Sequence, residues 1–352
     1  MQREIKQKKQ DLGIFYTDKR IVNFIFDILK IWKEKQDKET GRWIKKGHHP
    51  SVVDPAVGEG IFLKIAIESG FTKTDWVFGL DIDEDIVKKW KEINLLKEFG
   101  GKEEDLTAHF FHQNGLDKIQ WEQHIDKYKY KLKQEDIIKQ QFDTVVGNPP
   151  YGGIGVDFKG KLTPENRKLL DVLHDFEIFG FKKNRHDIEE VDPNGKKHYS
   201  LTLLEQISLK DDLEIAKNSV RNYQVSLEDA MTMSHGMPIE ILFLERFIQL
   251  AKPEGWIAII IPDGILTNSN SHYVREFISK KVRVEAIVSL PRDAFKNVGT
   301  SAKTSILFLQ KYKDQGEKRD LNYPVFLASI ESLEEKYFKI IKDAYKKHYT
   351  KI

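Results

Sequence analysis

The chain contains a short turn whose residues could do chemistry, Asn148-Pro149-Pro150-Tyr151. The side-chain oxygen of Asn148 and the carbonyl oxygen of Pro149 are hydrogen-bond acceptors, and the prolines restrict φ, so both acceptors are positioned before a ligand binds. Two such acceptors can hold both N–H groups of a planar exocyclic amine and favour the tetrahedral nitrogen that a nucleophile needs. Tyr151 adds an aromatic face on which a base lifted from a duplex can stack. A rigid loop after a buried strand is the alternative interpretation.

A glycine loop lies upstream of this turn, where a predicted strand at 51–53 leads into DPAVGEG at residues 54–60 and then into a helix. Glycines at such a place let a ligand approach the backbone, because no Cβ intervenes and amide N–H groups point outward. Asp81 stands 23 residues beyond Gly58, after the next predicted strand, where a carboxylate can accept hydrogen bonds from both ribose hydroxyls. Leu63 occupies the position of a third fingerprint glycine, so a nucleoside cofactor without a diphosphate, S-adenosylmethionine (AdoMet), fits better than a dinucleotide. Plain turn glycines and a helix-capping carboxylate are the alternatives.

These residues need a scaffold, and the pattern of apolar residues predicts one. Strand-length apolar runs alternate with helical patterns, which favours an α/β fold with a mostly parallel sheet and helices on both faces. Seven strands are predicted, at residues 51–53, 76–80, 108–113, 142–146, 256–261, 284–290 and 305–310. Asp18 is placed to cap a helix whose apolar residues recur every three or four positions from Ile21 to Leu29.

Two stretches depart from this alternation. Residues 152–236, directly after the turn, have mixed polarity, balanced charge and no clear strands, and we expect a mainly helical insertion there, near the cleft that would hold a substrate. Residues 314–352 are too few for a domain of ordinary size, so we expect a C-terminal tail or the start of a linker to a recognition module. Residues 1–313, with the insertion, are predicted to form one catalytic domain.

Composition limits the classes of protein. The chain has 352 residues and 57 Lys and Arg against 55 Asp and Glu, and the formal net charge of +2 excludes nucleic-acid binding through bulk charge and leaves local patches. It has no cysteine, which excludes disulfides, thiolate metal sites and a cysteine nucleophile and fits a reducing compartment, so we expect the cytoplasm. We predict no signal peptide, no membrane span and no metal site.

Taken together, the motifs resemble those of amino-group-specific DNA methyltransferases that modify adenine at N6, over residues 11–313. The turn matches the catalytic motif of that family, which implies catalytic roles for its four residues. The segment LPRDAF at 290–295 is similar to the one whose aromatic residue closes the other side of the flipped base, so Phe295 is expected to stack opposite Tyr151. The resemblance also implies the Rossmann-like fold of AdoMet-dependent methyltransferases.

Other segments resemble the cofactor-binding motifs of the family. Residues 13–17, GIFYT, look like the N-terminal motif beside the methionine part of AdoMet, and residues 54–62 look like the AdoMet loop. Asp81 looks like the ribose-binding acid, Ile82 like the residue that packs on the cofactor adenine, and Asn114 stands where the family often has an acid near that adenine. The implied cofactor-binding residues are Phe15, Tyr16, Thr17, Asp54, Pro55, Ala56, Gly58, Gly60, Asp81, Ile82 and Asn114.

The order of the motifs resembles the gamma-type arrangement of type I modification subunits and fused type II restriction-modification enzymes. The resemblance implies methyl transfer from AdoMet to N6 of a flipped adenine in DNA, in a restriction-modification or related anti-phage system. Double-stranded DNA is the implied substrate. The implied partner is a specificity subunit or a fused C-terminal target-recognition domain, with a restriction subunit as a further one.

Two other functions are compatible with the same turn. Enzymes that use AdoMet to methylate guanine N2 in ribosomal RNA or a glutamine amide in release factors share it, although their cofactor loops more often lack the DPA form and the preceding FYT motif. A catalytically idle AdoMet-binding scaffold in a defence complex is the third interpretation, against which the intact Asn148, Pro149 and Tyr151 argue.

Overall fold

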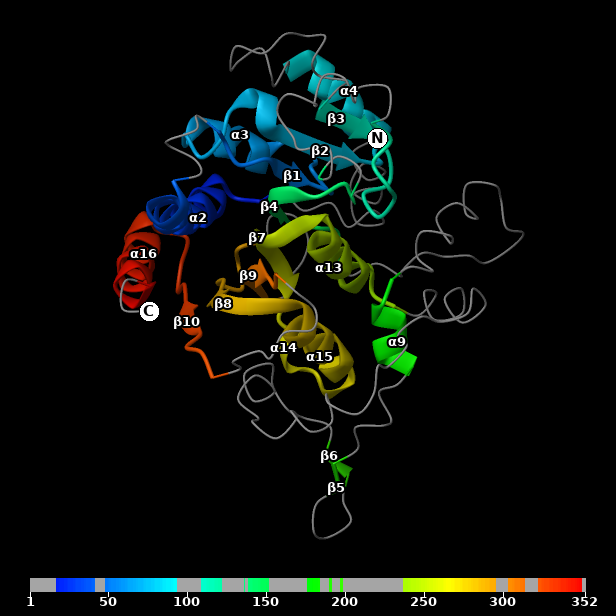
Figure 1. Ribbon diagram of the computed structural model, residues 1–352, viewed down its shortest axis with the longest axis vertical. Helices are drawn as coiled ribbons and strands as arrows, with labels where there is room; N and C mark the ends of the chain where they lie inside the picture. The colour runs from blue at the N-terminus through cyan, green and yellow to red at the C-terminus, as the bar shows by residue number, and fades with distance from the viewer. Residues whose placement is uncertain are drawn as a thin grey trace, which may run out of the picture.

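Eight strands form one sheet in the middle of the protein (Figure 1). The structure is a computed structural model and describes residues 17–41, 48–93, 109–121, 136, 139–151, 176–183, 190–191, 197–198, 237–295, 303–313 and 322–349. The strands of this sheet are β1 (Val52–Asp54), β2 (Val77–Asp81), β3 (Phe110–His112), β4 (Phe142–Gly147), β7 (Ala251–Pro262), β8 (Val282–Ser289), β9 (Thr304–Lys311) and β10 (Phe326–Ser329). Their order is β10-β8-β9-β7-β4-β1-β2-β3; β9 runs antiparallel to β7 and β8, and the other neighbours pair in parallel.

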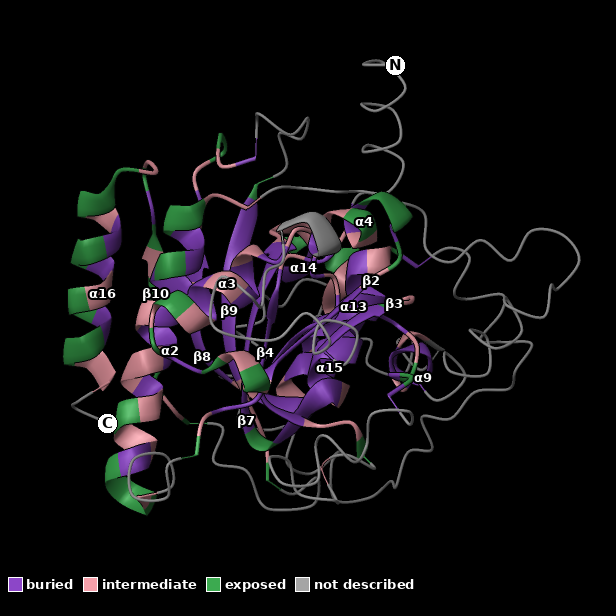
Figure 2. Ribbon diagram, turned by 90° about the horizontal axis from the view of Figure 1, so that it is seen from above, coloured by how far each residue is buried: buried purple, intermediate pink, exposed green. Residues whose placement is uncertain are grey.

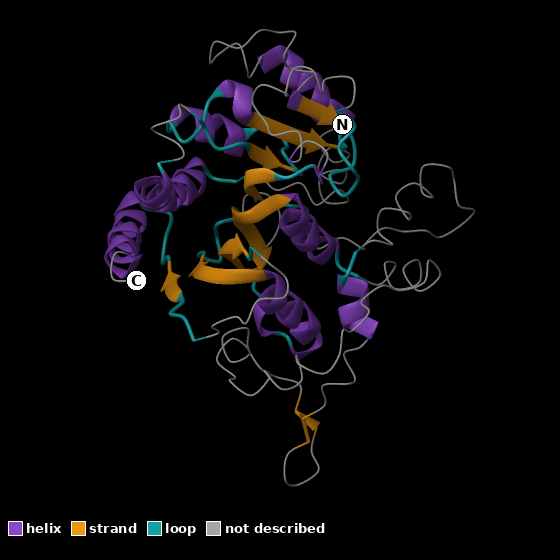
Figure 3. Ribbon diagram, viewed as in Figure 1, coloured by secondary structure: helices purple, strands orange, loops and turns teal. Residues whose placement is uncertain are grey.

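Helices cover both faces of the sheet (Figure 3). One face carries α9 (Ile178–Lys183), α13 (Ile239–Leu250), the short α14 (Gly264–Thr267) and α15 (His272–Lys281), whose buried side chains share one core. The other face carries α2 (Lys19–Thr40), α3 (Ile61–Glu68), α4 (Glu84–Ile93) and α16 (Glu335–Tyr349), which share a second core. Within the described ranges, no helix combines the length and the apolar character that a bilayer crossing requires.

Alternation along the strands divides the apolar side chains between these two cores. In β7, the odd-numbered residues from Ile257 to Ile261 belong to the core under α13, and the even-numbered residues from Trp256 to Ile260 belong to the core under α2. Successive side chains of a strand point to opposite faces, so a continuous apolar run is buried on both sides. The predicted parallel sheet with helices on both faces is therefore confirmed.

Helix α2 begins as the sequence predicts. The Asp18 side chain accepts a hydrogen bond from the Arg20 backbone N–H at 2.8 Å, which is an N-cap interaction. The apolar residues that follow face the second core, and the indole N–H of Trp32 donates to the hydroxyl of Tyr345 on α16. The start of α2 is therefore fixed to the body of the protein.

The sheet has one strand more than the seven predicted. This strand, β10, lies with α16 in the segment 314–352, which we expected to be a tail or linker. β10 is an edge strand in which half-buried and exposed residues alternate, and the sequence analysis missed it although residues 325–328, VFLA, form an apolar run of strand length. The insertion contains α9, preceded by the described residues Phe176 and Glu177, and an antiparallel pair, β5 (Glu190–Val191) and β6 (Lys197–His198); its other residues lie outside the described ranges. The domain boundary at residue 313 stays a prediction.

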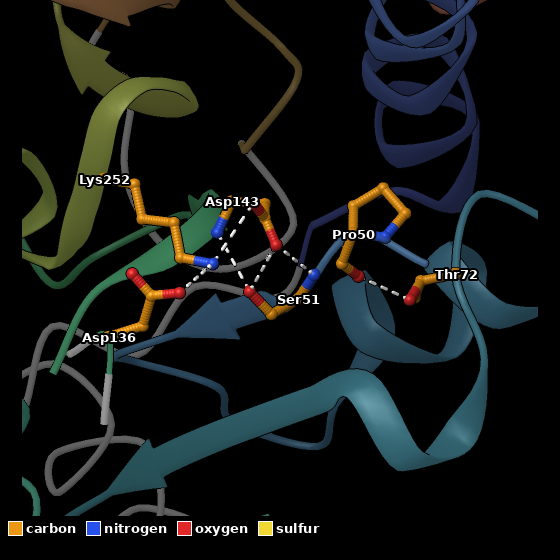
Figure 4. A network of polar contacts seen from close by, with 6 residues as sticks. All are labelled: Pro50, Ser51, Thr72, Asp136, Asp143 and Lys252. Atoms are coloured by element: carbon orange, nitrogen blue, oxygen red, sulfur yellow. Dashed lines mark hydrogen bonds and ion pairs between the residues drawn. The ribbon is translucent and has the colours of Figure 1, made fainter. Parts of the chain in front are cut away.

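A buried polar network joins β1, β4 and β7 near their amino ends (Figure 4). One carboxylate oxygen of Asp143 accepts hydrogen bonds from the backbone N–H and the hydroxyl of Ser51, at 3.0 and 2.8 Å. The other oxygen lies 3.2 Å from the ammonium nitrogen of Lys252, which also pairs with Asp136 at 2.9 Å. The network satisfies polar groups that the sheet has removed from water, and it lies at the opposite end of the strands from the predicted site.

We expect Asp143→Ala to lower the free energy of unfolding by about 3 kcal/mol. The substitution leaves the two Ser51 donors without their acceptor and removes one of the two carboxylates that pair with the buried Lys252 ammonium group. Urea denaturation measures this. The control is Glu84→Ala, which removes an exposed ion pair with Lys88 and should change stability by less than about 0.5 kcal/mol. Equal losses in the two variants would contradict a structural role for the network.

Candidate active site

The predicted cofactor loop and the predicted catalytic turn follow two neighbouring strands. β1 pairs in parallel with β4, with Val53 beside Val145, so both strands end at the same edge of the sheet. Both are buried throughout, and Figure 2 shows β4 in purple at the centre of the protein. Ligands of open α/β sheets bind beyond the carboxyl ends of the strands, so the two motifs lie where this fold places a site.

The end of β1 touches the end of β4. Asp54 is fully buried; its Oδ1 accepts the Ala56 N–H at 2.9 Å, and its Oδ2 has no hydrogen-bond partner among the described residues. Gly147 has φ of 156°, and a Cβ there would lie 2.5 Å from Asp54 Oδ1, so the approach requires glycine. Burial raises the pKa of Asp54 to about 8, because the charged form would lose its water. At neutral pH the carboxyl group is mostly protonated and needs no cation.

Asp81 closes the glycine loop. Its Oδ2 accepts the Gly58 N–H at 2.8 Å, and its Oδ1 accepts the Asp83 N–H at 2.9 Å. A Cβ built on Gly58 would meet no atom within 4 Å, so the space beside the loop is open, and the neighbouring Ile82 is 57% exposed. Each carboxylate oxygen keeps a further lone pair, so Asp81 can still accept a ribose hydroxyl. The side chain that caps the following helix is that of Asp83, whose Oδ1 accepts the Asp85 N–H at 3.0 Å, so the structure does not support the helix-capping alternative for Asp81.

The loop after β3 lies against the cofactor loop. A Cβ on Gly115 would come within 1.8 Å of the Pro55 carbonyl oxygen, so the two loops touch through their backbones. Asn114 Oδ1 accepts the Leu116 N–H at 3.0 Å, which uses one acceptor site of its amide inside the loop. The structure thus places Asn114 beside the predicted AdoMet loop, and its contact with a cofactor adenine stays a prediction.

A buried arginine that the sequence analysis missed holds this loop. Arg246 of α13 is 5% exposed and donates to the carbonyl oxygens of Gly115 at 3.2 Å and Asp117 at 2.7 Å. Burial lowers its pKa to about 10, so the guanidinium group stays charged at neutral pH. The sequence indicates this residue only through its place in the apolar helix IEILFLERFIQL. A charged side chain is rarely buried in such a helix unless it has a polar partner.

Asn148 turns toward the start of α2. Its Nδ2 donates to Thr17 Oγ1 at 3.1 Å, while its buried Oδ1 finds no partner in the described part of the chain. Pro149 is buried and Pro150 is half-buried. The amide oxygen is therefore left as an acceptor, which is what an amine N–H requires. Of the predicted N-terminal motif, Thr17 is described, and Phe15 and Tyr16 lie outside the described residues.

The two rings predicted to flank the base pack against each other. The centroids of Tyr151 and Phe295 lie 6.3 Å apart with the planes at 81°, an edge-to-face contact, and the side chains are 3% and 1% exposed. Burial raises the pKa of Tyr151 above its usual value, and the nearby Asn148 side chain is a smaller, opposing cause. A base can stack on either ring only after this aromatic pair separates.

Gly147→Ala tests the contact between the two strand ends. We expect a loss of about 1–3 kcal/mol in the free energy of unfolding, because the new methyl group meets Asp54 and the backbone conformation disfavours alanine. Gly264→Ala is the control, since its Cβ would meet the movable amide end of Asn268, at 2.9 Å. Thermal and urea unfolding of both variants measure the difference, and a control loss as large as the Gly147 loss would refute the steric argument.

Asp54→Asn tests the buried carboxyl group through pH. The folded protein holds the proton up to about pH 8, whereas the unfolded chain releases it near pH 4, so this group lowers wild-type stability as pH rises between them. Asp54→Asn has no proton to release at this position. As pH rises, its free energy of unfolding relative to wild type should therefore increase by up to about 1.4 kcal/mol per pH unit. Denaturation at pH 5.5, 6.5 and 7.5 measures it. Parallel stability curves would mean that Asp54 is charged in the folded protein.

Two family models match the chain in different parts. The Eco57I restriction-modification methylase model matches residues 75–179, which include the catalytic turn, and the N-6 DNA Methylase model matches residues 216–348. No curated protein sequence matches the chain.

Solved structures share the fold at low sequence identity. A modification subunit of a putative type I restriction enzyme from Vibrio vulnificus YJ016 is 17% identical with a TM-score of 0.50, over 99% of this chain and 56% of that chain. The M protein of the type I restriction enzyme EcoKI is 14% identical with a TM-score of 0.50, over 94% of this chain and 53% of that one. A nuclease-deletion mutant of the type ISP enzyme LlaGI, in complex with a DNA substrate mimic, is 14% identical with a TM-score of 0.50, over 94% and 25%.

The chain therefore spans about half the length of the two type I subunits, and the structural likeness shows that it shares their fold. The matches to the two family models add evidence from the sequence to this likeness of fold. They agree with the family resemblance of the motifs: residues 75–179 are similar to the Eco57I restriction-modification methylase family, and residues 216–348 are similar to the N-6 DNA Methylase family.

Proposed function

We propose that the chain transfers a methyl group from AdoMet to N6 of a flipped adenine in DNA, as the modification component of a restriction-modification or related anti-phage system. The observation that carries the proposal is the state of Asn148. Its amide nitrogen is held by Thr17, and its buried amide oxygen lacks a partner in the described structure, next to the strand end that carries the glycine loop. The two family matches support the same activity.

The residues around the glycine loop fit AdoMet. The open space beside Gly58 lets a ligand reach the loop, Asp81 has lone pairs for ribose hydroxyls, and exposed Ile82 offers an apolar surface to an adenine ring. AdoMet supplies a methyl group on a positively charged sulfur. We assign AdoMet binding to the cofactor-binding residues predicted from the sequence other than Thr17, whose side chain contacts Asn148.

At the turn, Asn148 and Pro149 act on the acceptor amine. Asn148 Oδ1 accepts one N–H and the Pro149 carbonyl oxygen accepts the other, which reduces delocalisation of the nitrogen lone pair into the ring. The amine proton becomes acidic once the nitrogen has gained the methyl group, so no strong base is needed. The high pKa of Tyr151 keeps its hydroxyl protonated, so its part in the reaction is its aromatic face.

Selection of the DNA sequence belongs to another part of the system in this proposal. The V. vulnificus and EcoKI relatives are modification subunits of type I restriction enzymes, and the LlaGI structure contains a DNA mimic. We propose double-stranded DNA as the substrate, with residues 1–313 as the catalytic domain. A specificity subunit or a fused target-recognition domain would choose the site, and a restriction subunit would be a further partner.

Asn148→Ala should leave the dissociation constant for AdoMet within about twofold of wild type and lower the single-turnover rate of methyl transfer by at least about 100-fold, because one of the two acceptors for the amine is lost. Calorimetry gives the first quantity and rapid-quench assays with labelled AdoMet give the second. Unchanged AdoMet binding also shows that the variant is folded. A retained rate would remove Asn148 from the mechanism.

The substrate class is tested with the wild-type protein. Labelled AdoMet is incubated with DNA, RNA and protein acceptors, and mass spectrometry identifies the modified atom. N6-methyladenine in DNA supports the proposal. Methylated guanine N2 in RNA or methylated glutamine would replace it with the corresponding activity, and AdoMet binding without any transfer would indicate an idle scaffold.

A further inference from the structure

The start of α2 is joined to the catalytic turn by one hydrogen bond. Asn148 Nδ2 donates to Thr17 Oγ1 at 3.1 Å, across 131 positions of sequence. The family resemblance associates Thr17 with the methionine part of AdoMet, whereas its described side-chain contact is with the catalytic asparagine. The Thr17 hydroxyl group therefore acts on the orientation of the Asn148 carboxamide.

Thr17 is held in place by the helix that follows it. Asp18 caps α2 through the Arg20 N–H, and the Arg20 side chain returns to the same carboxylate at 2.7 and 2.9 Å. The 22-residue helix then packs into the second core and onto α16, with Lys342 pairing with Asp27 at 3.0 Å. The hydroxyl group of Thr17 thus projects from the start of a fixed element.

A carboxamide has two ends of nearly equal shape and opposite hydrogen-bonding character. Asn148 helps an amine only when its oxygen faces that amine, because a rotated amide would present N–H to N–H. The buried Oδ1 lacks a partner among the described residues, so it does not itself fix the rotation. An orphaned buried N–H is more costly than an orphaned C=O, so an acceptor for Nδ2 favours the productive orientation.

We propose that Thr17 is a positioning residue, whose hydroxyl group holds the amide nitrogen of Asn148 so that Oδ1 faces the amine of the target adenine. The inference rests on the proposed function and deepens it. It gives Thr17 a role in the chemical step in place of one in cofactor affinity. In this proposal α2 contributes to the rate of methyl transfer, because it fixes the position of Thr17, as well as to the stability of the fold.

Thr17→Val, which keeps the shape and removes the acceptor, should lower the single-turnover rate of methyl transfer about tenfold to a hundredfold at saturating AdoMet and DNA. The dissociation constant for AdoMet should stay within about twofold, which also shows that the variant folds. Thr17→Ser keeps the hydroxyl group and should restore the rate to within about threefold of wild type. A raised dissociation constant with an unchanged saturated rate, or no effect at all, would overturn the proposal.

A second comparison uses Asn148→Asp. Both ends of a carboxylate accept hydrogen bonds, so the orientation needs no fixing, and adding Thr17→Val to Asn148→Asp should change the rate less than about twofold. If Thr17 instead acted by binding the cofactor, Thr17→Val would lower the rate by the same factor in the wild type and in Asn148→Asp. If Asn148→Asp transfers no methyl group, the rate and affinity of Thr17→Val alone decide. A wild-type protein that does not methylate adenine N6 defeats the proposed function, whereas an active wild type with an unaffected Thr17→Val defeats this inference alone.

Discussion

The contact between Asp54 and Gly147 is the constraint on which the arrangement of the site depends. It places the first residue of the glycine loop against the last residue before the catalytic turn. The parallel pairing of β1 with β4 brings the two strand ends together, and the missing Cβ of Gly147 lets them touch. A buried, mostly protonated carboxyl group fits this place because it needs no ion pair that would occupy the space between the loops.

Each face of the sheet contributes one anchor to this edge. From one face, α13 sends Arg246 to the backbone of the loop after β3, and that loop lies on Pro55. From the other face, the start of α2 presents Thr17 to Asn148. One anchor is a side chain of α13, which holds a backbone loop, and the other is the side chain two residues before α2, which holds an amide. Elements buried in the two cores thus restrict groups that would otherwise have several conformations.

What the sequence predicts here is local. The cap at Asp18, the apolar runs of the inner strands and the loop joined to Asp81 follow from neighbouring residues or from one βαβ unit, and the structure contains them. The partnership of Arg246 with the β3 loop and the link from Thr17 to Asn148 depend on packing between distant segments, which no periodicity records. β10 was missed although residues 325–328 are apolar, because its place in the sheet depends on pairing with β8, a distant segment. The roles of the site residues stay predictions.

The edge-to-face packing of Tyr151 and Phe295 bears on how a base enters. Without a base, each ring fills the space beside the other and both stay buried. Such a pair contributes about 0.5–1.5 kcal/mol beyond its burial, whereas stacking of a base on an aromatic side chain contributes about 1–3 kcal/mol. In the proposed reaction the stacking of the adenine therefore offsets the free-energy cost of separating the two rings. A solvent molecule offers no such compensation, so in this proposal the two rings stay paired until the base arrives.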